Sequence, residues 1–188
     1  DPNTPLEETL QALVDIVKQG KALYVGISKY PSKAAGFAYA YLRERDVPCL
    51  LYQGRYNLLN REVEQEGLLT KAKEAGAGFV AFSPLAQGLL SDKYLSGKVE
   101  KGSRMALGHF LRRTALTEEL LKRLNRLSEI ASERGQSLAE MALAWLLKDD
   151  SVTSVIVGAS AVNQLQKNLN ALKNTSFSTE ELALIDNA

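Results

Sequence analysis

The 188-residue sequence has one cysteine, one histidine and no long apolar run. Its single cysteine, Cys49, has no partner for a disulfide within the chain and lies among apolar residues. We therefore expect a buried, inert thiol and a reducing, cytoplasmic compartment. No stretch approaches the ~20 apolar residues of a membrane span, and no signal-peptide pattern opens the chain. The sequence thus predicts no membrane partner.

An excess of charge of either sign is also lacking, since 23 Lys and Arg residues face 22 Asp and Glu residues. A net charge of +1 gives no reason to expect nucleic acid or an acidic membrane surface as a partner. No metal site is predicted. The length favours one globular domain, residues 1–188. Because the chain opens at Asp1 on a helix start, we expect a piece of a longer protein, whether natural or excised.

Four apolar runs each end in small or polar residues and precede a helix-like segment. They are Leu23–Ile27 before Ser28, Cys49–Leu51 before Tyr52 and Gln53, Phe79–Phe82 before Ser83, and Val152–Val157 before Gly158. Continuous apolar runs are typical of parallel strands, and βα proteins bind ligands at the carboxyl ends of such strands. The pattern predicts a shared polar floor for a bound molecule.

Helix signals separate these runs. They are Thr4 to Glu7, Pro31–Ser32 with a helix to about Arg45, Asn60 as a cap, Thr117, Ser137 with Glu140, a helix from about Ala161 to Leu172, and Ser178 with Glu181. The long irregular stretch 85–116 has a length that usually indicates function.

The predicted order is one helix followed by four βα units, with an extra helix before the last strand. A closed (β/α)₈ barrel needs eight strands and typically ~250 residues. Two interpretations remain: an open doubly wound sheet, or half of a TIM barrel. A helix before the first strand suggests a missing strand, so we favour an α/β fold that is half of a barrel.

The last strand–helix unit is a candidate anion site. Gly158 allows a close backbone approach, and the start of the next helix attracts phosphate. Ser160 can cap this helix or donate to a phosphate oxygen, while Gln164 and Asn168 lie one turn apart on one face. An ordinary strand–helix turn with a serine cap is the alternative.

A second candidate is the segment from Phe82 to Gly88. An aromatic at a strand end followed by Pro84 can hold a flat ring against a ligand, and core packing is the alternative. Gln53 at a buried strand end needs hydrogen-bond partners from the backbone or from a ligand amide. Lys93 and Arg104 follow in the long loop, where solvated side chains are the default.

Together these residues resemble the aldo-keto reductases, on the bacterial branch that is similar to potassium-channel β-subunits and includes glyoxal reductase-like enzymes. The resemblance rests on Leu23 to Ser28, Tyr52–Gln53, Tyr56 to Arg61, Phe82 to Tyr94, Ser103–Arg104, and Val155 to Ser160 with Gln164, Leu165 and Asn168. It implies the C-terminal half of the barrel, with NADPH as cofactor and a small aldehyde or ketone as substrate.

The resemblance also implies a role for each matched position. Ser28 and Gln53 would bind the nicotinamide carboxamide, and Phe82 would stack on its ring. The other implied cofactor contacts are Ser83, Pro84, Leu85, Gln87 and Lys93 over the pyrophosphate, Arg104 near the adenosine phosphate, and Gly158, Ser160, Gln164 and Asn168 at the adenosine end.

Some positions depart from the family pattern. Lys29 stands where many members carry Asn. Gly158 and Gln164 stand where other branches carry Lys and Arg, so the preference between NADPH and NADH stays open. The catalytic Asp, Tyr, Lys and His would lie on the first four strands, outside this chain, and His109 does not match the catalytic His. We expect no catalytic residue here and no turnover by the isolated chain.

Three functions remain open at this level. The first is the cofactor-binding half of an NADPH-dependent carbonyl reductase. The second is a nucleotide-binding regulatory module similar to the channel β-subunits. The third is a half barrel whose uncovered surface drives homo-oligomerisation. The sequence gives neither the physiological carbonyl nor the oligomeric state.

Overall fold

The computed structural model describes residues 3–99, 104–107 and 111–188, which fall into two compact units. The first unit takes in Asp1–Tyr56, Arg61–Phe82 and Asp150–Ser154, and the second takes in Asn57–Asn60, Ser83–Asp149 and Val155–Ala188. No helix within the described residues has both the length and the apolar content needed to cross a bilayer.

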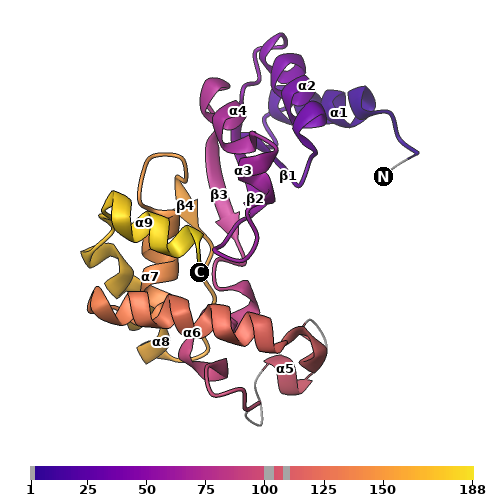
Figure 1. The fold of residues 1–188 in the computed structure, drawn as a ribbon. Helices are drawn as coiled ribbons and strands as arrows, with labels where there is room; N and C mark the ends of the chain where they lie inside the picture. Colours follow the sequence, from indigo (N-terminus) through magenta and orange to yellow (C-terminus); the bar gives the residue numbers. More distant parts are fainter. Residues whose placement is uncertain (1–2, 100–103, 108–110) are drawn as a thin grey trace. The chain divides into compact units, whose positions relative to one another are not determined.

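The first unit consists of a β-sheet and the helices that connect and cover its strands. Its elements are α1 (Leu6–Lys18), β1 (Val25–Ser28), α2 (Ser32–Arg43), β2 (Cys49–Arg55), α3 (Glu62–Gln65), α4 (Leu68–Glu74) and β3 (Gly78–Phe82), and the short β4 (Ser154–Val155) begins in it (Figure 1). The strand order is β1-β2-β3-β4, with β1 parallel to β2 and β2 parallel to β3. A helix-containing connection between consecutive parallel strands is the expected βα arrangement.

One sheet face is buried and the other is partly exposed. Ile27, Tyr52 and Phe79 are buried on the face that α2 and α4 cover. The opposite face carries Gly26, Ser28, Leu51, Gln53, Val80 and Phe82, all exposed or half-buried. Side chains alternate between the faces of a strand, so the register places these residues together on the second face.

The element boundaries correct several sequence predictions. β1 begins at Val25, β2 continues to Arg55, and β4 has only two residues instead of the predicted 152–157. The predicted third helix is two helices, because Gly67 between them has a left-handed backbone with φ of +67°. Pro5, rather than Thr4, is the N-cap of α1.

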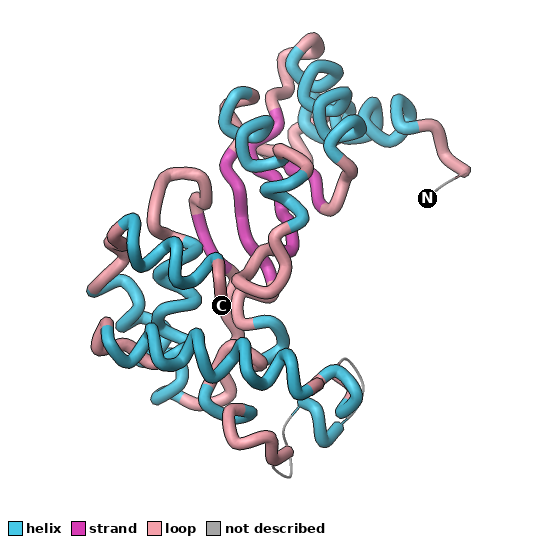
Figure 2. The backbone as a smooth tube through the Cα atoms, in the orientation of Figure 1, coloured by secondary structure: helices cyan, strands magenta, loops and turns pink. Residues whose placement is uncertain are grey.

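The second unit is mostly helical (Figure 2). It contains short 3₁₀ helices η1 (Ala86–Gly88), η2 (Asp92–Tyr94), η3 (Arg113–Ala115) and η4 (Ala171–Lys173), and α-helices α5 (Arg104–Leu107), α6 (Glu118–Glu133), α7 (Leu138–Leu146), α8 (Val162–Asn170) and α9 (Thr179–Asp186). The predicted caps Thr117, Ser137 and Ser178 are confirmed, and the last two form complete capping boxes.

Arg134 fixes α9 to the turn between α6 and α7. Its side chain is 3% exposed and donates to Glu181 Oε1 at 2.6 Å and to the Ser176 carbonyl at 2.9 Å. Its guanidinium lies 3.7 Å from the centre of the Phe177 ring. Because the buried Arg134 guanidinium is held by these charge-assisted hydrogen bonds, α9 has a defined position against the turn.

Candidate functional site

Two predicted site residues, Ser28 and Gln53, are neighbours across β1 and β2. They are partners in the parallel register, with Ser28 exposed and Gln53 half-buried. No hydrogen bond within the described residues uses the Ser28 hydroxyl or the Gln53 side-chain amide. A hydroxyl and an amide together supply donors and acceptors, the set that a planar carboxamide requires.

The turn that follows Ser28 is held in an unusual conformation. Lys29 has φ of +59°, and its backbone N–H donates to the Gln53 carbonyl at 3.1 Å. The buried Tyr52 hydroxyl donates to the Tyr30 carbonyl at 2.7 Å, which ties this turn to β2. Two contacts from β2 therefore hold the turn that directly follows Ser28.

Phe82, the third predicted group in this unit, ends β3 on the same sheet face. It pairs in register with Arg55, two residues beyond Gln53, and its ring is half-buried. The core of the unit therefore does not enclose Phe82 completely. The first unit thus brings Ser28, Gln53 and Phe82 to one face near the carboxyl ends of three strands.

The segment Ser83–Gly88, which follows β3, has a concentration of unusual backbone angles. Ser83, Ala86 and Gln87 have φ of +53°, +47° and +62°, a region that non-glycine residues enter at a cost of about 1–2 kcal/mol each. Gln87 Nε2 donates to Ser83 Oγ at 3.3 Å, which joins the two ends of the segment. Strained residues gathered in one loop indicate a functional segment.

Ser83–Gly88 is also held by a residue to which the sequence analysis gave no role. Asn57 is the only polar residue among those described that is fully buried, and its Nδ2 donates to the Ser83 carbonyl at 2.9 Å. The sequence offered one signal, an Asn at each end of the short apolar pair Leu58–Leu59, which is typical of a turn. In the structure Asn57 and Asn60 close that turn, so Asn60 does not cap a helix.

The start of α8 differs in detail from the prediction. Ala161 is the N-cap, so the prediction of Ser160 as the cap is wrong. Instead, the backbone N–H and hydroxyl of Ser160 donate to Gln164 Oε1 at 2.9 and 3.1 Å. Asn168 lies one turn further along and is half-buried, as is Gln164.

Gly158 lies in open surroundings just before this helix. A Cβ atom built at Gly158 would have no neighbour within 4 Å, and its φ is not in the left-handed region. Neither packing nor backbone angle therefore requires glycine here. The open space is compatible with close approach of a ligand to the backbone.

Four further predicted positions, Pro84, Leu85, Lys93 and Arg104, fall in the stretch of short helices after β3. Lys93 lies in η2 with an exposed side chain, while Pro84 and Leu85 lie in the segment Ser83–Gly88. Arg104 begins α5, but its side chain is outside the described part of the structure, as are Ser103 and His109 entirely. Lys93 is thus the predicted cationic contact that the structure places.

Burial suppresses the ionisation of three side chains in the first unit, Tyr39, Cys49 and Tyr52. Burial, with a smaller contribution from Glu66, raises the pKa of Tyr52 to about 12. Burial also raises the pKa of Tyr39 and of the Cys49 thiol. A group that donates a proton during catalysis at neutral pH needs a pKa near the working pH, and these groups have moved away from it.

Comparison with known proteins agrees with this arrangement of strands and loops. The model of the aldo/keto reductase family matches residues 1–188. The L-glyceraldehyde 3-phosphate reductase of Escherichia coli (strain K12) is 52% identical over 190 residues, which cover 99% of this chain and 55% of that protein. A probable voltage-gated potassium channel subunit beta from Oryza sativa subsp. japonica is 35% identical over 185 residues, covering 97% and 56%.

A crystal structure of a thermostable aldo-keto reductase with the inhibitor epalrestat superimposes with a TM-score of 0.71 at 30% identity. The superposition covers 100% of this chain and 56% of that chain. The chain therefore spans about half the length of the relatives it matches, and its α/β fold of parallel strands with flanking helices is that of these reductases. It belongs to the aldo/keto reductase family.

Proposed function

We propose that this chain supplies the cofactor-binding half of a parent enzyme that reduces aldehydes or ketones with NADPH. The family and the similar reductase support an oxidoreductase as the parent. The observation that carries the proposal is the register of Ser28 with Gln53 on the sheet face that also carries Phe82. In this proposal residues 1–188 form one domain, the C-terminal half of the barrel, in a cytoplasmic protein.

The side chains present fit the nicotinamide end of the cofactor. The Ser28 hydroxyl and the Gln53 amide would bind the carboxamide, because they offer both donors and acceptors. The half-buried Phe82 ring would stack on the nicotinamide and set its exposed face. When bound, NADPH supplies the hydride, whereas these residues only hold and orient the ring.

The remaining contacts would come from the second unit. We assign the pyrophosphate to the segment Ser83–Gly88 through Ser83, Pro84, Leu85 and Gln87, with Lys93 and Arg104 for the phosphate charges. Gly158, Ser160, Gln164 and Asn168 would hold the adenosine end. Ser160 and Gln164 already form a small hydrogen-bonded pair at the start of α8, so the adenosine end would meet a preorganised polar surface.

Binding of NADPH to the 188-residue chain tests this proposal. Ser28→Ala and Gln53→Ala should each weaken binding about five- to tenfold, since each removes one hydrogen bond of ~1 kcal/mol. Leu50→Ala, at an exposed position of β2, is the matched control and should leave affinity unchanged. Titration by NADPH fluorescence measures these constants. Equal affinities for all four proteins would contradict the assignment.

The same preparation should not oxidise NADPH when methylglyoxal or L-glyceraldehyde 3-phosphate is added. The reduction needs a proton donor, and we find no suitable one among the described residues. Turnover by the isolated chain would show that a catalytic group lies within it and would overturn this part of the proposal.

A regulatory role is the second candidate, and the similarity to a potassium channel subunit beta is the observation that favours it. Both functions use the same cofactor site, so NADPH binding does not separate them. Steady-state turnover of the full-length parent does, because a sensor module should bind the cofactor tightly while reducing carbonyls very slowly.

A further inference from the structure

We propose that Asn57 is a positioning residue that holds the segment Ser83–Gly88 in the conformation that binds the cofactor. This inference rests on the proposed function, because it concerns the segment assigned there to the pyrophosphate. Within the described residues, Asn57 makes its hydrogen bonds to Ser83 and to its own turn, and none to a residue that the proposal assigns to the nicotinamide or the adenosine end. It acts through the backbone of Ser83.

The first step is the hydrogen bonding of the Asn57 side chain. Its Nδ2 donates to the Ser83 carbonyl at 2.9 Å, and its Oδ1 accepts from the N–H groups of Leu59 and Asn60 at 3.0 and 2.9 Å. One side chain therefore closes its own turn and reaches a residue 26 positions away. Asp lacks the donor, and Ser and Ala cannot supply both functions.

The second step is what this bond does at Ser83. The Ser83 carbonyl accepts from both Asn57 Nδ2 and the Ala86 N–H, the latter at 3.0 Å, so both of its lone pairs are used. Ser83 has φ of +53°, and Ala86 and Gln87 are also left-handed. Such angles persist only where surrounding contacts hold them, and the Asn57 bond is a buried contact of that kind.

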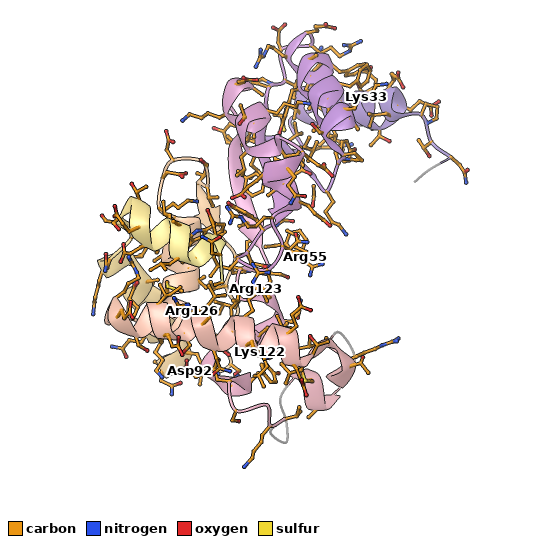
Figure 3. All side chains as sticks on the ribbon, in the orientation of Figure 1. Lys33, Arg55, Asp92, Lys122, Arg123 and Arg126 are labelled. Atoms are coloured by element: carbon orange, nitrogen blue, oxygen red, sulfur yellow. The ribbon has the colours of Figure 1, made fainter. Side chains whose placement is uncertain are left out.

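The third step is the support of the Asn57 turn itself. Arg123 on α6, labelled in Figure 3, donates through Nη2 to the Leu58 carbonyl at 3.3 Å. The backbone N–H groups of Asn57 and Asn60 donate to each other's carbonyls at 3.1 and 3.0 Å. The turn is thus fixed to a long helix of the same unit, and it offers Ser83 a rigid anchor.

The effect on binding depends on the fraction of molecules whose segment Ser83–Gly88 is in the binding conformation. If only a fraction of molecules has the segment Ser83–Gly88 in the binding conformation, the apparent dissociation constant rises by the inverse of that fraction. Asn57→Asp keeps the acceptor for Leu59 and Asn60 but places a carboxylate against the Ser83 carbonyl. We expect this variant to bind NADPH about tenfold more weakly.

The experiment compares two nucleotides on the 188-residue chain. Asn57→Asp should weaken the binding of NADPH, which has a pyrophosphate. It should leave the affinity for 2′-AMP unchanged, because 2′-AMP reaches only the adenosine end. Partial unfolding of the variant would lower its affinity for both nucleotides equally. Asn187→Asp makes the same chemical change at an exposed asparagine at the end of α9, where Nδ2 donates to the Ala183 carbonyl, and serves as the control.

A second variant covers the case in which Asn57→Asp does not fold. Arg123→Lys removes the hydrogen bond to the Leu58 carbonyl while keeping the charge. It should weaken the binding of NADPH several-fold without changing the affinity for 2′-AMP. If either variant folds and binds NADPH as tightly as the wild type, the inference is wrong.

Hydrogen exchange without nucleotide separates this inference from the proposed function. Loss of the Asn57 anchor should speed exchange at the Ala86 and Gly88 amides, which donate within the segment. A wild-type chain that binds neither nucleotide would overturn the proposed function, and the exchange rates would still report on the anchor. Unchanged rates at both amides in a folded Asn57→Asp variant would overturn the anchor.

Discussion

At the scale of single residues, the sequence identified polar groups but not their supports. Ser28, Gln53 and Phe82 could be predicted as neighbours because they end buried apolar runs, and their register depends on sheet pairing alone. Asn57 could not be given its role, since its bond to Ser83 spans 26 residues and depends on tertiary packing. The left-handed Ser83, Ala86 and Gln87 were also beyond prediction, because none of them is glycine.

Cys49 provides a prediction at this scale. Its side chain is buried, with the residue 6% exposed, and burial raises the pKa of its thiol. Since the thiolate is the reactive species, we expect Ellman's reagent to label the folded chain at pH 8 at least tenfold more slowly than the urea-unfolded chain. Equal labelling rates in the two states would show that the thiol is accessible in the folded chain.

At the scale of elements, local signals predicted the caps of three helices, α6, α7 and α9, but not those of α1, α3 and α8. Thr117, Ser137 and Ser178 cap α6, α7 and α9 as predicted, because a cap depends on residues three positions away. The run 152–157 was predicted as one strand, but only Ser154–Val155 is a strand, β4. Val155 and Val157 pack on Leu143, Ala144 and Ala171 in the helical unit, a contact that the local sequence does not reveal.

The capping box of α7 gives a pH-dependent prediction. Burial opposes the charge on Glu140, but hydrogen bonds from Ser137 outweigh it and hold the pKa of Glu140 below 4.5. Because the folded state lowers this pKa, the stabilisation is present above pH 4.5 and is lost as the pH falls through the lowered value.

Glu140→Gln keeps an acceptor for the Ser137 N–H but removes the charge. It should lower the free energy of unfolding by about 0.5–1 kcal/mol at pH 7 and by less at pH 3. Urea unfolding at the two pH values measures this difference, with Glu133→Gln at the exposed end of α6 as the control. A difference that is the same at both pH values would contradict the assigned pKa.

At the scale of the whole molecule, α8 has its apolar side outward within the described residues. Val162, Leu165 and Leu169 on α8 and Leu172 on the following η4 are 45–83% exposed, whereas the polar Gln164 and Asn168 are half-buried. The spacing of the four apolar residues forms one stripe along α8 and η4. The sequence predicted a helix from about Ala161 to Leu172, but it could not show which face lacks a partner, because that depends on the rest of the fold.

We therefore expect the isolated 188-residue chain to self-associate through this stripe. Leu169→Glu together with Leu172→Glu should shift sedimentation velocity profiles toward the monomer. Asn163→Glu adds a charge to α8 away from the stripe and should leave the profile unchanged. If the wild-type chain sediments as a monomer at about 100 µM, where a dimer contact of about −5.5 kcal/mol would already hold half of the chains, the expectation is wrong.

Gly54, which is buried in β2, packs against two rings on the covered face of the sheet. A Cβ atom there would lie 2.7 Å from Phe79 Cζ and 3.0 Å from Tyr52 Cε1, two rings that stack with their centres 5.6 Å apart. The Tyr52 hydroxyl in turn holds the Tyr30 carbonyl, next to Lys29 and Ser28. In a saturation mutagenesis scan, position 54 would then group with the nicotinamide contacts, although no atom of Gly54 is assigned to the ligand.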